Sequence, residues 1–343
     1  MLTSEERRLL RAPLLTPLER VPRVLSGLQI GSLAFSAAEA TRLCGSLLPE
    51  SCGWGAALKL VSALNRSGLP HALAKGPLVE VTAAGSVGLK GAPEVGFLQV
   101  FYPTARERGG LPLRDLLGVN AAWQRYATGV RFPGLERPLR PFFSVFAHPR
   151  RFGHLLLLDR WLRSSAGAQA LAGGPVADVG TGCGVVALRL LARGVQVVAG
   201  DVNPNAVLGL LLEKRRMEDA EAQLLTVFHS DLFRNLPGPF SLVCFNPPWI
   251  PGMPRSLSDL GNYLPDDLLY RFFQDALSHL LPSGRIALMF PSLQGLAAAI
   301  KHKDDVILSH PVLDALTTTP ELVAAERLVS PDGLDELWVL QRA

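Results

Sequence analysis

The sequence predicts an α/β fold in its second half, with a doubly wound, mainly parallel sheet, preceded by an N-terminal α+β domain. Two observations predict it. Short apolar runs alternate with amphipathic stretches from residue 176 onward. The first run, 176–179, breaks into a glycine-rich turn, and the next run ends at an acidic residue, Asp201. Ligands bind such folds at the carboxyl ends of the strands, where the strand order reverses.

Local signals place the elements of this half. The helix 185–193 stops at Gly194, a residue favoured just past helix ends. Asn203 can cap the next helix, with Pro204 at its first position. The turn 282–284 separates an amphipathic helix from the strand that follows it. The expected strands are 176–179, 195–199, 224–229, 240–245, 285–290, 306–308 and 336–341, and the expected helices are 185–193, 204–216, 267–281 and 293–300.

The first half has weaker signals. Helices are expected at 36–48 and 56–67, and short strands at 78–82, 86–89 and 97–101, an order compatible with a winged-helix-like unit. The proline-rich stretch 132–141 is typical of a linker. These signals divide the chain into an accessory, substrate-recognition domain (1–125), a linker and pocket-entry segment (126–150) and a second domain (151–343).

Charge is distributed unevenly along the 343 residues. Residues 1–150 hold 18 Lys/Arg against 10 Asp/Glu, whereas residues 151–343 hold 16 against 20. The basic half indicates an anionic macromolecular partner, and arginines used for solubility explain it equally well. The chain shows no signal-peptide pattern, no apolar run of membrane-spanning length and no zinc-type cysteine spacing. We therefore expect a cytoplasmic protein with reduced cysteines and no metal, and assume a monomer.

The glycine turn discriminates between nucleoside cofactors. A dinucleotide fold requires a third glycine where this chain has Val185. The glycines run instead as Gly180, Gly182 and Gly184, and Asp178 lies two residues before the first. A carboxylate in the turn would repel a pyrophosphate, but it suits a cofactor that carries an ammonium group.

This pattern resembles the class I S-adenosylmethionine-dependent methyltransferases, over about residues 176–290. The resemblance implies a seven-stranded Rossmann-like sheet and S-adenosylmethionine as the cofactor. It implies that Asp178 lies near the cofactor's amino group, that Asp201 binds the ribose hydroxyls and that Asp231 approaches the adenine amino group. The turn would supply the remaining cofactor contacts, from Gly180, Thr181, Gly182 and Gly184.

The fourth expected strand ends in Asn246-Pro247-Pro248-Trp249. It is similar to the Asn-Pro-Pro-Tyr motif of amino-methyltransferases, with tryptophan in place of tyrosine. An amide or aryl amine nitrogen is a poor nucleophile because its lone pair is delocalised. The Asn246 side-chain oxygen and the Pro247 carbonyl can accept its two protons and return electron density to nitrogen, while proline stiffens the loop. Trp249 would stack on a planar group. We therefore predict N-methylation, with these four residues at the catalytic site and with Asn246 also in contact with the cofactor.

Several acceptors remain open. The motif is shared by HemK-like protein glutamine methyltransferases and by enzymes that methylate adenine or guanine amines in RNA or DNA, including the methyltransferase small domain group. A small-molecule N-methyltransferase and a non-catalytic cofactor-binding scaffold are further alternatives. Arginines and aromatic residues alternate over 123–163, which would suit nucleic acid binding, although packing at a domain junction explains the aromatic residues slightly better. Within it, Phe146, His148 and Arg150 are expected near the substrate pocket.

Overall fold

The computed structural model describes residues 75–81, 87–89, 97, 109–147, 152–299 and 309–343. Contacts divide the chain into two compact units, Arg11–Ala127 and a unit formed by Met1–Leu10 with Thr128–Ala343. The expected helices 36–48 and 56–67 and the expected strand 306–308 lie outside the described residues. Of the helices that are described, none has the length and apolar character that crossing a membrane requires.

The first unit contains a small antiparallel sheet and a helix. Its strands are ordered β2-β1-β3, and α5 (Leu113–Thr128) follows β3 directly. The strand bounds are β1 (Lys75–Val81), β2 (Val87–Leu89) and β3 (Gly109–Pro112). The first two strands confirm the sequence expectation, but Phe97, the one described residue of the expected strand 97–101, is helical. Its ring packs against Trp123 and Tyr126 of α5, with centroids 5.2 and 5.1 Å away, so tertiary packing overrides its strand propensity.

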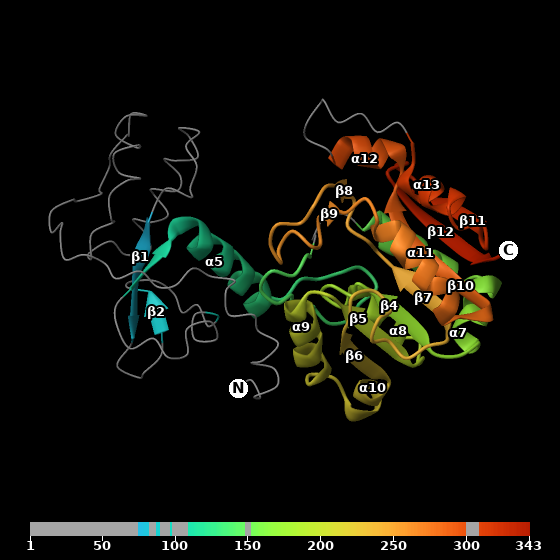
Figure 1. The fold of residues 1–343 in the computed structure, drawn as a ribbon. Coiled ribbons are helices and arrows are strands. Elements are labelled where there is room, and N and C mark those ends of the chain that lie inside the picture. Colours follow the sequence, from blue (N-terminus) through green and yellow to red (C-terminus); the bar gives the residue numbers. More distant parts are fainter. Residues whose placement is uncertain (1–74, 82–86, 90–96, 98–108, 148–151, 300–308) are drawn as a thin grey trace. The chain divides into compact units, whose positions relative to one another are not determined.

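The second unit is built on a seven-stranded sheet of order β11-β12-β10-β7-β4-β5-β6 (Figure 1). The five strands from β10 to β6 are parallel, and β12 and β11 are antiparallel to their neighbours. The order reverses between β4 and β7, so ligand binding is expected at their carboxyl ends. The strand bounds are β4 (Val176–Val179), β5 (Val197–Asp201), β6 (Leu225–His229), β7 (Phe240–Phe245), β10 (Leu280–Pro291), β11 (Leu322–Val329) and β12 (Asp335–Arg342). The predicted doubly wound, mainly parallel sheet is confirmed.

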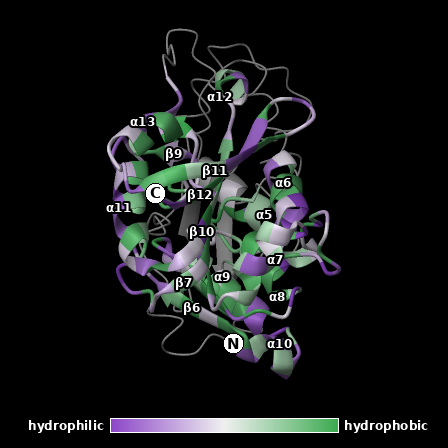
Figure 2. Ribbon diagram, turned by 90° about the vertical axis from the view of Figure 1, so that its right-hand side faces the viewer, coloured by the Kyte–Doolittle hydropathy of each residue, from purple (hydrophilic) through white to green (hydrophobic). Residues whose placement is uncertain are grey.

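Helices cover both faces of this sheet. Successive residues of a strand point to opposite faces, so Val176 belongs to one core and Ala177 to the other. The first core contains α6 (Gly153–Leu162), α7 (Ser165–Ala172) and α8 (Val185–Leu191), and the second contains α11 (Leu268–His279), α12 (Leu293–Ala299) and α13 (Pro311–Thr317). The helices α9 (Pro204–Lys214) and α10 (Asp219–Gln223) lie beside β6. Figure 2 shows the largely hydrophobic α8 and α9.

The segment 129–147, which we call the strap, joins α5 to the rest of the second unit without a helix of its own. Three side chains of the helices bind its backbone. Arg189 donates to the Pro133 carbonyl, Asn205 donates to the Phe143 carbonyl at 3.0 Å, and Glu213 accepts from the Arg140 N–H at 3.2 Å. Phe132, Leu139, Phe142 and Phe143 are buried. The proline-rich stretch 132–141 inside it is therefore anchored to the domain near both of its ends, by the buried Phe132 and Leu139.

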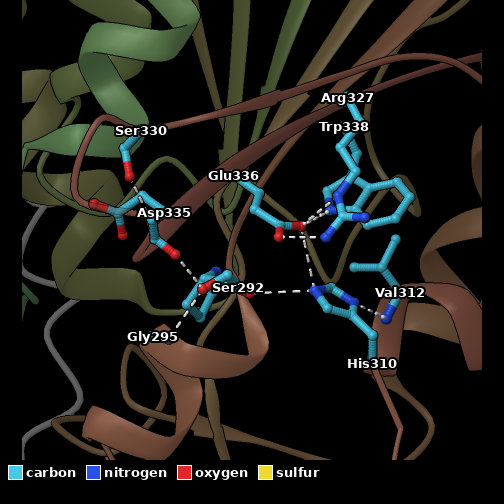
Figure 3. A network of polar contacts seen from close by, with 11 residues as sticks. Ser292, Gly295, His310, Val312, Arg327, Ser330, Asp335, Glu336 and Trp338 are labelled. Atoms are coloured by element: carbon cyan, nitrogen blue, oxygen red, sulfur yellow. Dashed lines mark hydrogen bonds and ion pairs between the residues drawn. The ribbon is translucent and has the colours of Figure 1, made fainter.

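The last two strands enclose a buried acidic group (Figure 3). Glu336 of β12 accepts hydrogen bonds from Arg327 of β11 at 2.5 and 3.0 Å and from Trp338 at 2.8 Å, and His310 lies 3.4 Å from it. Burial alone would raise its pKa, but hydrogen bonds from His310 and Arg327 outweigh burial and bring the pKa to about 2. The cluster ties α13, which His310 caps, to the antiparallel edge of the sheet.

Two sequence expectations need correction here. Strand β10 begins at Leu280 and not at residue 285, because the stretch 282–284, expected as a turn, is an irregular part of the strand beside Phe240. The element order also contains α13 and β11, which the sequence analysis did not anticipate. Strand β11 lies at the sheet edge with most of its residues exposed, so it lacks an apolar pattern.

Candidate active site

A cavity of about 540 Å³ opens at the carboxyl ends of β4, β5, β6 and β7. Its wall includes nearly all of the predicted cofactor and catalytic residues that the structure describes. From β4, the glycine turn and the ends of the next two strands come Asp178, Gly180, Thr181, Gly182, Asp201 and Asp231, and from the end of β7 come Asn246, Pro247, Pro248 and Trp249. The structure thus brings together two motifs that lie more than sixty residues apart in the sequence. Gly184 is not part of the wall.

The glycines of the turn are required for different reasons. Gly180, Gly182 and Gly184 have φ angles of 65°, 54° and 83°, a region that favours glycine. A Cβ on Gly184 would lie 2.6 Å from the Leu210 side chain, so this glycine allows α8 and α9 to pack closely. A Cβ on Gly182 would meet no atom closer than 4.0 Å. The space beside Gly182 therefore belongs to the cavity, and a ligand can approach its backbone.

Asp178 holds the turn against α8. Its Oδ2 accepts hydrogen bonds from the Thr181 hydroxyl at 2.6 Å and from the Ala187 N–H at 2.9 Å. Burial raises the pKa of Asp178 to about 7, even though both hydrogen bonds stabilise the ionised carboxylate and so lower its pKa. A second carboxylate, Asp201, adds to the increase. A buried acid of this kind would be stabilised in its ionised form by a cationic ligand.

Asp201 links the glycine turn to the end of β5. Its Oδ2 accepts from the Gly182 N–H at 2.8 Å, and its Oδ1 accepts from the Asn203 N–H at 2.7 Å. Burial raises its pKa as well, against the effect of these two hydrogen bonds. Asn203 caps α9 by accepting from the Asn205 N–H, as the sequence predicts. The carboxylate is thus held at the cavity by the backbone of two loops.

Asp231 lies at the more open part of the site. Its side chain is 48% exposed and forms an ion pair with Arg271 at 3.1 Å. Arg271 also pairs with Asp267 at 2.8 Å, one turn earlier on the chain, and it lines the cavity. The sequence analysis did not single out Arg271, although its spacing from Asp267 suits an i, i+4 pair on the expected helix. An arginine therefore stands beside the residue expected to approach the adenine.

The end of β7 presents two enclosed polar atoms. The Asn246 Oδ1 and the Trp249 Nε1 are buried, and neither has a hydrogen-bond partner in the described part of the chain. A buried polar atom without a partner costs about 1–3 kcal/mol, so such atoms commonly mark a functional site. Both residues line the cavity. A ligand that enters it with an N–H donor would satisfy Asn246.

His154, which the sequence analysis did not identify, lies beside both residues. It is 6% exposed and lines the cavity. Its Nε2 is 3.5 Å from the Asn246 Nδ2, and its ring meets the Trp249 ring edge to face, with centroids 5.3 Å apart. His154 belongs to no spacing motif with the residues after β7. Only the fold brings it to them.

Two further segments meet at the cavity. Phe146 of the strap is 40% exposed and lines it. A short parallel pair, β8 (Ile250–Pro251) and β9 (Tyr263–Leu264), carries the loop 252–262. The Ser258 hydroxyl donates to the Ser144 hydroxyl at 2.9 Å, and Gly261 lies so close to Phe146 that a Cβ would be 2.5 Å from the Phe146 Cβ. The predicted pocket residues His148 and Arg150 lie outside the described residues.

The site fits the cofactor that the sequence resemblance implies. S-adenosylmethionine carries an ammonium and a sulfonium charge, and the buried carboxyl groups of Asp178 and Asp201 have pKa values raised by burial. A cationic ligand would offset the cost of their ionisation. The open space at Gly182 admits a ligand close to the backbone. Over the described residues, no group of three or more His, Cys, Asp or Glu side chains could hold a metal ion.

Part of the chain is similar to known methyltransferases. Residues 152–305 match the family described as the methyltransferase small domain. A relative from Methanocaldococcus jannaschii, named as a protein N5-glutamine methyltransferase, is 28% identical over 128 residues, which are 35% of this chain and 63% of the relative. A ribosomal RNA small subunit methyltransferase C of Chromohalobacter salexigens is 29% identical over 180 residues, 51% of this chain and 46% of the relative.

A release factor glutamine methyltransferase of Deinococcus radiodurans is 36% identical over 86 residues. These residues are 24% of this chain and 30% of the relative. The chain thus spans less than two thirds of the length of each of these three relatives.

Proposed function

We propose that this chain uses S-adenosylmethionine to methylate a planar nitrogen on a macromolecule, on the basis of the match of residues 152–305 to the methyltransferase small domain family. The single observation that carries the proposal is the buried Asn246 Oδ1, which has no partner among the described residues, in a cavity shared with the glycine turn. An oxygen or carbon nucleophile would not need an amide acceptor and a proline carbonyl at this position. An amide or exocyclic amine does.

We assign cofactor binding to the wall formed by the turn and the strands beyond it. Ionised Asp178 would favour the cofactor's ammonium group, directly or through water, and Asp201 would accept hydrogen bonds from the ribose hydroxyls. Asp231 would approach the adenine amino group, with Arg271 holding its carboxylate in place. Thr181 and the three glycines of the turn keep the backbone in position.

We assign the reaction to the residues after β7. When bound, the cofactor supplies an electrophilic methyl group, whose carbon–sulfur bond breaks as the carbon–nitrogen bond forms. Asn246 Oδ1 and the Pro247 carbonyl accept hydrogen bonds from the two protons of the acceptor nitrogen, which raises its electron density. Pro248 limits the backbone freedom of the loop, and Trp249 stacks on the planar group. The nitrogen then releases one proton to water.

The acceptor that we favour is the side-chain amide of a protein glutamine in the translation apparatus, which would place the enzyme in the cytoplasm. Two of the relatives support it, because both are named for glutamine methylation. An exocyclic amine of RNA is the second candidate. It is supported by the ribosomal RNA relative, whose match covers the largest share of this chain among the three. The basic balance of residues 1–150 suits that candidate.

The test uses the full chain, S-adenosylmethionine with a tritiated methyl group, and extract from a strain that lacks the gene. If protease releases the tritium label and nuclease does not, the result would support the glutamine acceptor. Label that nuclease releases would reject it in favour of the nucleic acid acceptor. Cofactor binding by calorimetry without any labelled product would overturn the catalytic proposal and indicate a scaffold.

Asn246→Ala tests the mechanism in the same assay. Loss of one fixed hydrogen-bonding group at a reacting centre commonly lowers the rate by about 100-fold or more, and we expect that loss here. The dissociation constant for the cofactor should change by less than about threefold, or about 0.7 kcal/mol. Gln223→Ala removes an exposed amide from α10 and is the matched control. Transfer by the Asn246→Ala variant at the normal rate would contradict the assignment.

A further inference from the structure

We infer that His154 is a positioning residue that selects which end of the Asn246 amide faces the acceptor nitrogen. The inference rests on the proposed function, since it concerns the same amide. His154 belongs to neither sequence motif, and it lies on the helix α6. Its basis is the placement of the imidazole against both Asn246 and Trp249.

Within the described residues, the Asn246 side chain has one hydrogen-bonding neighbour. Its Nδ2 lies 3.5 Å from the His154 Nε2, whereas its Oδ1 has no partner within the described residues. An amide nitrogen is a donor only, so the imidazole nitrogen that faces it must act as the acceptor. His154 is then neutral, with its proton on Nδ1. The contact is at the long end of the hydrogen-bond range, as is common for catalytic contacts in the absence of substrate.

The amide orientation decides whether the site can work. With the NH₂ group directed to His154, the carbonyl oxygen is left to accept a proton from the acceptor nitrogen. If the amide were turned by 180°, its NH₂ group would instead face the N–H groups of the acceptor, and two donors would oppose each other. An imidazole with its proton on Nε2 would favour this wrong orientation. The tautomer of His154 and the orientation of Asn246 are therefore coupled.

The fold holds His154 rigidly enough to act in this way. The helix α6 begins with Gly153, where a Cβ would lie 2.2 Å from the Asp335 Oδ2 of β12, so the helix start is packed directly on the sheet. At the other end of the helix, the Trp161 Nε1 donates to Glu326 of β11 at 3.2 Å. A helix fixed at both ends is a precise support for a site residue.

Contact with Trp249 fixes the imidazole plane. The two rings meet at 84° with centroids 5.3 Å apart, an edge-to-face arrangement. Trp249 is also the residue that replaces the tyrosine of the related motif. One imidazole therefore touches both the amide that polarises the acceptor and the ring that stacks on it. Loss of the imidazole should disturb the transfer step without altering the cofactor wall.

The first test needs neither cofactor nor acceptor. The full chain contains seven histidines, and nitrogen NMR of protein labelled in its histidines identifies the His154 signals by their absence from His154→Gln protein. We expect the proton on Nδ1, and a change of the Nε2 signal in Asn246→Ala but not in Gln223→Ala. The inference would be overturned by a proton on Nε2 in the unmodified protein, or by an Nε2 signal that is the same in the unmodified protein and in Asn246→Ala.

The second test is kinetic and uses the tritiated-methyl assay with extract. His154→Leu keeps the bulk and removes the acceptor, so kcat should fall by at least about tenfold, because small misplacements of a reacting group can cost 100-fold. His154→Gln supplies a carbonyl acceptor and should recover most of kcat. The cofactor dissociation constant should stay unchanged in both variants.

His279→Gln is the matched control, because this half-buried histidine at the end of α11 is not part of the cavity wall. Equal activity of His154→Leu and unmodified protein would sink the inference and leave the proposed function intact. Absence of transfer by unmodified protein would instead reject the proposed function, while the NMR result would still decide the His154–Asn246 contact.

Discussion

The carboxylate of Asp201 accepts a hydrogen bond of 2.8 Å from the backbone N–H of Gly182, and so joins the end of one strand to the turn after its neighbour. Its other oxygen accepts from the Asn203 N–H at 2.7 Å, at the start of α9. One side chain therefore sets the positions of two loops that line the cavity. Removal of the Asp201 carboxylate should therefore weaken ligand binding by more than the loss of any single contact between Asp201 and the ligand.

Asp201→Asn should weaken cofactor binding without unfolding the domain. An amide offers one acceptor oxygen, so one of the two backbone N–H groups loses its partner and faces an NH₂ group. Loss of such a hydrogen bond costs about 1–3 kcal/mol, and the dissociation constant should rise at least about fivefold. Calorimetry with S-adenosylmethionine measures it. Asp219→Asn, on the exposed start of α10, is the control, and equal constants for all three proteins would contradict the role of Asp201.

Gly182→Ala and Gly194→Ala form a matched pair. Both glycines have positive φ angles, 54° and 73°, and a Cβ on either would meet nothing closer than 4.0 Å. Each alanine should therefore lower the unfolding free energy by a similar amount, about 1–2 kcal/mol, from backbone strain alone. Only the methyl group at Gly182 enters the cavity wall, so only Gly182→Ala should weaken cofactor binding. Urea unfolding and calorimetry separate the two effects, and equal binding by both variants would refute the placement of the cofactor.

Cofactor binding should weaken as the pH falls below 7. Burial raises the pKa of Asp178 to about 7, so the free protein is increasingly protonated there below that pH. The cofactor's ammonium group favours the ionised carboxylate, so binding must release this proton. Between pH 7 and pH 5.5 the affinity should fall by about tenfold, in a range below the titration of the cofactor's α-amino group.

Calorimetry in two buffers of different ionisation enthalpy measures the proton release directly. Asp178→Asn protein should bind the cofactor more weakly and show little dependence on pH over the same range. Binding of the unmodified protein that is constant from pH 5.5 to 7 would show that Asp178 does not face the ammonium group.

The domain should lose stability in acid through Glu336. Its pKa in the folded protein is about 2, below the ordinary glutamate pKa of 4.5 that applies to the unfolded chain. The unfolded state therefore binds the proton first, and the stabilisation is complete above about pH 4.5 and lost as the pH falls towards 2. The shift corresponds to at most about 3 kcal/mol.

Urea unfolding from pH 7 to pH 3 measures this dependence. Glu336→Gln should be less stable at pH 7, since Arg327 and His310 lose an ionised partner, and its unfolding free energy should change less with pH. Glu321→Gln, at an exposed position before β11, is the control. Parallel pH curves for Glu336→Gln and unmodified protein would contradict the assignment.

The sequence predicted those elements whose signals are local. The strand 240–245 has the predicted bounds, and Asn203 caps α9 with Pro204 at its first position. Such features depend on residues a few positions apart, which the sequence displays directly. Each of the two motifs at the cavity is likewise a local pattern. Their meeting was predictable because the ends of neighbouring parallel strands lie at one edge of the sheet.

The unpredicted parts depend on distant residues. His154 and Asn246 are 92 positions apart, and no pattern in either segment indicates their contact. Strand β11 at the sheet edge has mostly exposed residues, so it carries no apolar alternation. The early start of β10 was missed because proline, serine and glycine at 282–284 are typical of a turn, whereas here they continue beside Phe240.

The reversal of strand order between β4 and β7 lies between the two parts of the cavity wall that we propose for the methyl donor and for the acceptor. The wall that we propose for the methyl donor comes from the ends of β4, β5 and β6, and the wall that we propose for the acceptor comes from the end of β7 and the loop 252–262. Exchange of residues 246–264 for the equivalent piece of another family member should therefore redirect the enzyme to a new acceptor while it continues to use the same donor. Acceptor specificity would then depend on one segment of the chain that can be exchanged without altering the donor site.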